Sequence, residues 1–217
     1  MSDAVARAAR DRGARRKAQT RATLIRAAQR LIAEGRTNVA VLEITQAAEI
    51  GSGSFYNHFA TKEDLFEAAV DDALELQGQA LDVLTADLDD PADAFARSYR
   101  LTGRMHRVQP ELSKVILSRG PAMVTSEHGL GPRALRDIVA ATEAGRFTVS
   151  DPQAALLIIG GAAMTLGQYI HDHPEIDDAA LTDQVTEDLL RMLGLKPRDA
   201  AAICAHDLPD VPVPTEA

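Results

Sequence analysis

The sequence has little of what secreted, membrane or sheet proteins are built from. Its 217 residues include one cysteine, Cys204, no tryptophan and only 4% aromatic residues. One cysteine cannot form an internal disulfide, and the charged segment 1–17 lacks the apolar core of a secretory signal. The longest apolar stretch, Ala154–Thr165, is shorter than the roughly 20 residues that span a bilayer. We expect a cytoplasmic protein without a membrane partner.

Strand patterns are also missing. No run of β-branched and aromatic residues alternates with period two, whereas apolar residues recur at helical spacing along the chain. Helices are expected at about 17–34, 62–84, 91–108, 110–118, 132–145, 154–172 and 179–193, with two short ones inside 41–59. The glycine- and proline-rich segment Ser118–Pro132 is expected to be a long loop. The sequence predicts an all-α fold.

Charge is distributed unevenly along the chain. Residues 1–62 contain 11 basic and five acidic residues, a net charge of +6, whereas residues 63–217 carry −15. A positive end on an acidic body favours contact between that end and a polyanion. A solvated basic tail on an ordinary acidic protein would show the same asymmetry, so charge alone leaves both readings open.

The segment Val41–Phe59 carries the clearest functional pattern. A short helix with Ile44 on its apolar face meets a break at residues 49–51, and a second short helix anchored by Phe55 and Phe59 follows. Two short helices joined by a tight turn are typical of a helix-turn-helix. The second helix exposes small or hydrogen-bonding side chains, which suit the donors, acceptors and methyl groups of a DNA major groove.

The run ITQAAEIGSGSFYNHF at residues 44–59, followed by Lys62-Glu63-Asp64-Leu65, closely resembles the DNA-binding domain of tetracycline-repressor-like (TetR family) regulators. The resemblance covers residues 17–77. Four positions depart from the family pattern: Ala40 and Gly51 replace Ser/Thr caps, Thr45 replaces an alanine, and Glu49 replaces the turn glycine.

The resemblance implies a domain order. Residues 1–16 would be a flexible basic arm, 17–77 a three-helix DNA-binding domain with its helix-turn-helix at about 40–59, and 78–208 a helical effector-binding and dimerisation domain. Residues 209–217, which contain three prolines, are expected to be a disordered tail.

By resemblance, the chain is a homodimeric transcriptional regulator of double-stranded DNA, and a repressor released by a small molecule. Two copies of the second helix would enter successive major grooves of a near-palindromic operator. The DNA-contacting positions carried over by the motif are Ser52, Gly53, Ser54, Tyr56, Asn57, His58 and Lys62. The arm Arg7–Lys17 is expected to add phosphate or minor-groove contacts. For Tyr56, packing within the small bundle is the alternative to a phosphate contact.

The second half of the chain carries less specific patterns. The helices 154–172 and 179–193 resemble the pair that forms the family's dimer interface; a core helix of a monomer is the alternative for the first of them. Methionine, aromatic and histidine residues in the middle helices predict a partly apolar effector pocket. Its candidate residues are Tyr99, Met105, His106, Leu112 and Ile116, for each of which ordinary core packing is the competing reading.

Other functions find less support in the sequence. No catalytic triad order, phosphate-binding loop or dinucleotide turn is present, so an enzyme is not expected, and no cofactor is expected. The spacings His171-x-His173 and Cys204-x-His206 are poor for chelation on a helix, so no metal site is predicted. A non-specific DNA-binding or adaptor protein without an effector remains the alternative, and activation remains open beside repression.

Overall fold

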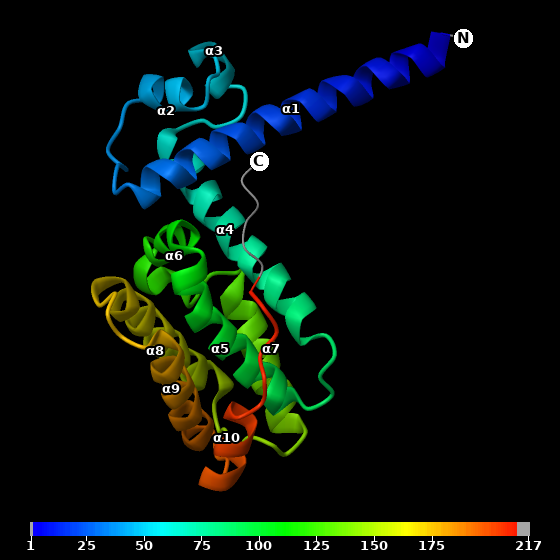
Figure 1. Ribbon diagram of the computed structural model, residues 1–217. Coiled ribbons are helices and arrows are strands. Elements are labelled where there is room, and N and C mark those ends of the chain that lie inside the picture. Colours follow the sequence, from blue (N-terminus) through cyan, green and yellow to red (C-terminus); the bar gives the residue numbers. More distant parts are fainter. Residues whose placement is uncertain (1, 212–217) are drawn as a thin grey trace. The chain divides into compact units, whose positions relative to one another are not determined.

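The computed structural model describes residues 2–211, and within this range it contains helices and no strand. The helices, shown in Figure 1, are α1 (Ser2–Ala33), α2 (Val41–Ala47), α3 (Ser52–Phe55), α4 (Lys62–Thr85), α5 (Pro91–Val108), α6 (Pro110–Leu117), the 3₁₀ helix η1 (Gly120–Met123), α7 (Leu130–Glu143), α8 (Pro152–Asp172), α9 (Asp178–Met192) and α10 (Pro197–Cys204). The predicted all-α fold is confirmed. Two compact units divide at Asp72 and Ala73, inside α4.

The first unit is a small helical bundle built on one face of α1. Leu24, Ala28 and Leu31 recur at helical spacing on that face and are buried. Phe55 of α3 and Leu65 of α4 are fully buried in the same unit. Gly35 ends the helix in a left-handed conformation (φ 72°), as expected of a C′ glycine.

Helix α1 is longer than the sequence pattern predicted. The apolar stripe placed its start near Lys17 and left residues 1–16 as a flexible arm, whereas the helix begins at Ser2. The added turns are rich in alanine and arginine, which favour helix by intrinsic propensity. They carry no apolar stripe, and the stripe was the signal from which the helix was predicted.

The second unit is a larger bundle centred on α5. This helix packs against α7, α8 and α9, and α10 covers the end of α9 (Figure 1). Phe95, Ile138, Ile170 and Leu190 lie in its apolar core. Asp183 of α9 is held by two arginines of α5, at 2.8 Å from Arg100 and from Arg104.

Three helix starts in this unit follow the same local rule. Asp90, Asp151 and Asp177 each cap a helix by accepting backbone N–H groups, and proline follows the first two. The predicted loop 118–132 is shorter than expected, because η1 lies inside it and α7 begins at Leu130. Pro132 occupies the first turn of α7, where its missing N–H costs nothing. Of the predicted disordered tail, residues 212–217 lie outside the described residues.

Candidate nucleic-acid interface and ligand cavity

The helix-turn-helix segment presents a polar surface anchored by two buried rings. Phe55 and Phe59 are 0% and 6% exposed, and their ring centroids lie 6.0 Å apart. Between and before them, the predicted DNA-contacting residues reach solvent: Ser52, Gly53, Tyr56 and Asn57 are exposed, and Ser54 and His58 are half-buried. Tyr56 is 65% exposed, so its phenol is available to a partner.

The regular part of α3 is short. It ends at Phe55, and residues 56–58 continue it as turns. Neither Ala40 nor Gly51 makes a side-chain cap, as their lack of a hydroxyl requires. Glu49 in the turn adopts a left-handed conformation (φ 53°) that favours glycine. Three of the four departures from the family pattern, at Ala40, Glu49 and Gly51, therefore fall at positions with a defined backbone role.

A polar groove of about 680 Å³ lies between α1 and the helix-turn-helix. Gly13, Arg16 and Lys17 line it from α1, and Ser54 and Asn57 line it from the other side. His58 also lines it, and its buried Nδ1 has no hydrogen-bond partner. Burial and the nearby charges of Lys17 and Arg21 lower the pKa of His58, so its imidazole is neutral at pH 7.

Lys62 is less free than its predicted role implies. Its side chain is half-buried, and Nζ donates to the Val39 carbonyl at 3.2 Å and to Asn38 Oδ1 at 3.4 Å. The lysine thus fastens the loop before α2 to the start of α4. Contact with a phosphate requires it to share or exchange these partners.

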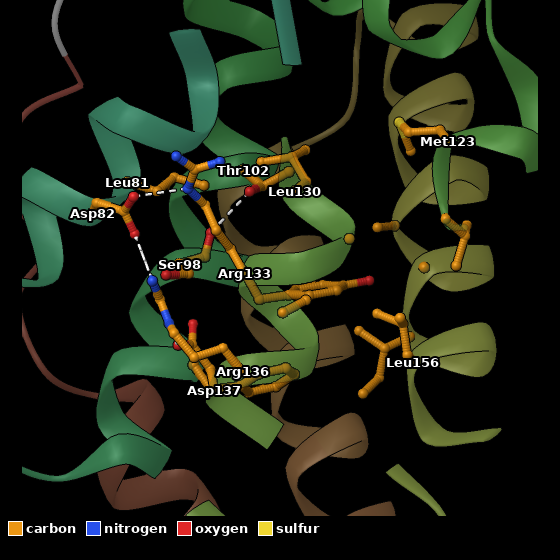
Figure 2. A pocket seen from close by; sticks show the side chains of 18 residues that line it. Leu81, Asp82, Ser98, Thr102, Met123, Leu130, Arg133, Arg136, Asp137 and Leu156 are labelled. Atoms are coloured by element: carbon orange, nitrogen blue, oxygen red, sulfur yellow. Dashed lines mark hydrogen bonds and ion pairs between the residues drawn. The ribbon is translucent and has the colours of Figure 1, made fainter. Parts of the chain in front are cut away.

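The second unit contains an apolar cavity of about 90 Å³. Its apolar walls come from five segments and include Leu81 of α4, Phe95 of α5, Met123 of η1, Leu130 of α7 and Leu156 of α8. Figure 2 shows that the polar side chains Asp82, Arg133 and Arg136 gather on one side of this space, with Met123 and Leu156 on the other. The cavity therefore has an apolar body and one polar wall.

Tyr99 lines this cavity and has an unpaired hydroxyl. The residue is 7% exposed and lines the space, and its buried hydroxyl has no hydrogen-bond partner. Burial raises the pKa of Tyr99 far above its ordinary value, so the phenol stays neutral. A buried hydroxyl without a partner is costly, and a bound molecule with a polar atom would satisfy it.

The polar wall is a network of ion pairs. Arg133 Nε lies 2.7 Å from Asp82 Oδ2, and Arg136 Nη1 lies 3.2 Å from Asp82 Oδ1 (Figure 2). Arg136 also donates to Asp137 at 2.9 Å. Burial raises the pKa of Asp137 although Arg136 opposes the shift. A largely buried carboxyl group at a cavity is suited to accept hydrogen bonds from hydroxyl groups of a ligand.

The five predicted effector residues do not meet at this cavity. Tyr99 lines it, whereas Met105 packs beside Leu101 in a separate apolar cluster. His106, Leu112 and Ile116 are likewise absent from its lining. Three charged residues of the lining were not predicted, because charged residues on amphipathic helices are indistinguishable in sequence from a solvated face. They are Asp82, Arg133 and Asp137.

His106 belongs to a small polar cluster instead. Its Nδ1 lies 2.6 Å from Ser113 Oγ, which in turn lies 2.8 Å from His171 Nε2. Burial and the neighbouring His171 lower the pKa of His106 to about 4, so the ring is neutral at pH 7. Its ring fills the space above Gly167, where a Cβ would lie 2.5 Å from the imidazole. The cluster joins α5, α6 and α8 by packing and hydrogen bonds.

Helix α8 leaves an apolar face uncovered. Leu157, Ile158 and Tyr169 are between 46% and 56% exposed, and Met192 of α9 is 44% exposed. By length and composition α8 could cross a membrane, but its other face packs against α5, α6 and α7. The core helix of a soluble protein can pass the same test of length and composition.

Within residues 2–211, no group of three histidine, cysteine or acidic side chains is arranged to hold a metal ion. His171 is engaged with Ser113, and the ring of His173 pairs with Glu175 at 3.1 Å.

Two family models match the chain. The model described as "Tetracyclin repressor-like, C-terminal domain" matches residues 90–206, and the model "Bacterial regulatory proteins, tetR family" matches residues 24–69. No curated protein sequence matches the chain significantly.

Solved structures agree with the family models. The crystal structure of RolR in complex with resorcinol is 35% identical, with a TM-score of 0.72 over 92% of this chain and 100% of that one. RolR without ligand is 35% identical, with a TM-score of 0.70 over 87% of this chain and 98% of that one. A TetR-family transcriptional regulator from Pectobacterium atrosepticum is 25% identical, with a TM-score of 0.60 over 84% and 98% of the two chains.

Domains of this family are in general non-enzymatic parts of soluble DNA-binding proteins. One family model covers more than half of the chain, and a structure 35% identical covers nearly all of it. The chain belongs to the TetR family of transcriptional regulators, with a helix-turn-helix DNA-binding domain and a helical ligand-binding C-terminal domain.

Proposed function

We propose that this protein is a cytoplasmic, homodimeric, sequence-specific repressor, without enzymatic activity, that a small single-ring effector releases from its operator. The observation that carries the proposal is the cavity of the second unit, whose lining includes Tyr99 with a buried hydroxyl that has no hydrogen-bond partner. The family model and the exposed polar helix-turn-helix surface support the DNA-binding part.

The DNA contact is assigned to the surface around α3. Ser52 and Gly53 at its start are exposed and small, and nothing lies within 4 Å of a Cβ built on Gly53, so the backbone can approach a base edge. Asn57 supplies an amide that can pair with adenine, and Tyr56 a hydroxyl for a phosphate. Lys62 contributes a phosphate contact when its ammonium group exchanges the hydrogen bond to the Val39 carbonyl for one to a phosphate oxygen.

The dimer is assigned to the uncovered face of α8 and α9. Leu157, Ile158, Tyr169 and Met192 expose apolar surface that a second copy would remove from water. In a dimer of this kind a two-fold axis relates the two helix-turn-helix motifs, which fits a near-palindromic operator.

The effector is assigned to the single-ring phenols. A cavity of about 150 Å³ holds benzene, so the cavity of about 90 Å³ has to widen to admit a single ring and is too small for an extended molecule. Tyr99 and the carboxyl group of Asp137 offer hydrogen bonds to hydroxyl groups. Resorcinol, bound by the 35% identical RolR, is a single ring with two hydroxyls and is the first compound to test.

Release follows from unequal affinity for two conformations. If resorcinol binds a conformation with displaced DNA-binding helices more tightly, operator affinity falls by the ratio of its two affinities. A ratio of about 100 corresponds to roughly 2.7 kcal/mol of coupling.

The test begins with selection of a duplex from a random library by the full-length protein. Operator affinity is then measured at fixed salt with and without resorcinol, catechol and phenol, and binding of each compound is measured by calorimetry. We expect selection of a near-palindrome and at least tenfold weaker DNA binding with a phenol that binds. A protein that selects no sequence contradicts the repressor, and phenols that bind without changing DNA affinity contradict the effector role.

A further inference from the structure

One wall of the apolar cavity is not a long helix. Four of its walls belong to α4, α5, α7 and α8, which are between 14 and 24 residues long. The fifth consists of Met123 and Val124, which lie on the short segment between α6 and α7. The two side chains are 7% and 8% exposed, so they cover the cavity on this side. Because the cavity has to widen to admit a ring, one of these walls has to move.

A glycine in the left-handed conformation lies at each end of this segment. Gly120 has a φ of 59° and Gly129 a φ of 79°. Glycine moves between this conformation and others without a Cβ clash. Nothing lies within 4 Å of a Cβ built on Gly120, so the backbone there also has space to turn. Rotation at the two glycines would swing residues 121–128 as a unit.

Hydrogen bonds inside the segment would move with it. The amide of Val124 donates to the Pro121 carbonyl at 3.1 Å, and the amide of Ser126 to the Met123 carbonyl at 3.3 Å. The amide of His128 donates to Ser126 Oγ at 3.3 Å. The polar wall on the other side of the cavity is instead tied between α4 and α7 by ion pairs (Figure 2). Movement of the segment keeps both sets of bonds.

Val124 rests on backbone rather than on side chains at two positions. A Cβ built on Gly160 of α8 would lie 2.6 Å from Val124 Cγ1. One built on Gly131 of α7 would lie 2.8 Å from the Val124 carbonyl oxygen. Because both positions are glycine, no side chain there has to turn when Val124 leaves or returns.

From these features we infer that residues 120–129 are the gate of the effector cavity, an inference that rests on the proposed function. Rotation about Gly120 and Gly129 carries Met123 and Val124 out of the wall and opens the cavity between α7 and α8. The opening gives a single ring both its entry and the space that the closed cavity lacks. The segment then closes over the bound ring, so its motion sets the rates of effector entry and exit.

The first test measures access to the cavity without an effector. In full-length C204S/I159C protein the one thiol lies at Ile159, which is 3% exposed and lines the cavity. Its reaction with methyl methanethiosulfonate reports opening. G120A strains the closed gate, because a left-handed alanine costs enough to shift an equilibrium about tenfold, and labelling should become about tenfold faster.

G145A is the matched control. Gly145 also has a positive φ, 69°, and open space around a built Cβ, but it lies beyond the end of α7 and outside the lining of the cavity. It should leave the labelling rate unchanged. Urea unfolding of each variant measures how much of any increase comes from global unfolding.

The second test measures resorcinol exchange by NMR and its affinity by calorimetry, in proteins that keep Ile159 and Cys204. G120A strains the closed gate in free and bound protein alike. Both rate constants should therefore rise about tenfold while Kd stays within about twofold of wild type. G145A should change neither rate constant.

The outcomes separate the gate from the proposed function. Equal labelling of I159C in the G120A and G145A proteins would overturn the gate and leave the repressor and its effector standing. Faster labelling with R136A but not with G120A would place the entry at the polar wall, which also overturns the gate. Faster labelling with G120A alone, in a protein that binds no resorcinol, catechol or phenol, would support the gate and contradict the effector.

Discussion

Arg133 of α7 binds both carboxylate oxygens of Glu75 on α4, at 2.9 and 3.0 Å. The same guanidinium reaches Asp82 two turns further along α4, at 2.7 Å. Gly78 makes this possible, because a Cβ there would lie 2.6 Å from Arg133 Nη1. One arginine therefore lies flat along α4 and also lines the apolar cavity.

This arrangement gives the cavity a direct connection to α4. Asp82 and Arg133 line the space, and α4 is one continuous helix from Lys62 to Thr85. A ligand that donated a hydrogen bond to Asp82 or accepted one from Arg133 would weaken their mutual contact. The helix that follows the helix-turn-helix in sequence is then held less firmly at its C-terminal half.

The Glu75–Arg133 pair predicts a pH dependence of stability. The hydrogen bond from Arg133 lowers the pKa of Glu75 from 4.5 to about 2 in the folded protein. The unfolded state therefore binds the proton first, so this contribution is complete above about pH 4.5 and is lost as the pH falls toward 2. In E75Q the free energy of unfolding should fall less steeply between these pH values. Urea unfolding at several pH values measures the slope.

The control for this measurement is E143Q, an exposed glutamate at the end of α7. Because Glu75 is 42% exposed, solvent screens the pair and the difference between E75Q and wild type should be modest. Equal slopes for E75Q, E143Q and wild type would show that the pair adds nothing to stability.

Replacement of Tyr99 by phenylalanine tests the cavity hydroxyl. It removes a buried donor that has no partner in the free protein, so the variant should be at least as stable as wild type. If the effector hydrogen-bonds to this hydroxyl, its loss should weaken resorcinol binding by up to about tenfold, the equivalent of about 1.4 kcal/mol. Calorimetry measures the affinity for resorcinol, and thermal unfolding measures the stability.

Y56F is the matched control, because Tyr56 is 65% exposed and belongs to the other unit. Its resorcinol affinity should equal that of wild type. Unchanged affinity in Y99F would remove Tyr99 from the ligand site, whatever happens to its stability.

A lysine at Ile158 tests the proposed dimer. Ile158 is 56% exposed in the single chain, so the substitution should leave the fold of one subunit intact. In a dimer it would bury a charge on the apolar face and should shift the mass in light scattering from that of two chains to one. Val83, which is 75% exposed on α4, provides the control V83K. A wild-type protein that is monomeric at micromolar concentration contradicts the assignment at once.

The sequence predicted the fold well, because helix signals here are local. The Asp-Pro starts at 90–91 and 151–152 and the apolar spacing around Leu24 each act within a few residues, and the structure has helices at these places. The start of α1 was missed because intrinsic propensity leaves no periodic pattern. The motif at 44–59 identified the family, which the family models confirm.

The ligand cavity was far less predictable. Tyr99 and Met105 lie on one helix and read alike in sequence, yet only Tyr99 lines the cavity. Asp82 and Arg133 are 51 residues apart and meet only because α4 and α7 pack together. Such a site depends on which helix faces meet, and no local pattern carries that information.

Replacement of Lys62 by alanine separates its two roles. Loss of the bonds to Val39 and Asn38 should lower stability slightly, by about 0.5–1.5 kcal/mol. Loss of a phosphate contact should weaken binding to operator and random DNA alike and reduce the salt slope by about 0.9 per site. N38A removes one loop contact and keeps the ammonium group, so it should retain the slope. A normal slope in K62A would leave the lysine a purely structural role.

Glu49 combines backbone strain with an unfavourable charge, and two substitutions separate them. E49G removes both, because glycine adopts φ 53° without the Cβ clash. The strain relieved, roughly 1–2 kcal/mol, is partly offset by about 0.5–1 kcal/mol of extra unfolded-state entropy. E49G should therefore be more stable by up to about 1.5 kcal/mol. E49Q keeps the strain and should match wild type in thermal unfolding.

Both variants should bind DNA more tightly than wild type, because each removes the one acid that lines the groove. The gain should shrink as salt is raised, since the repulsion is screened. Tighter binding by E49G alone would assign the effect to backbone geometry, and no gain in either variant would mean that no phosphate approaches Glu49.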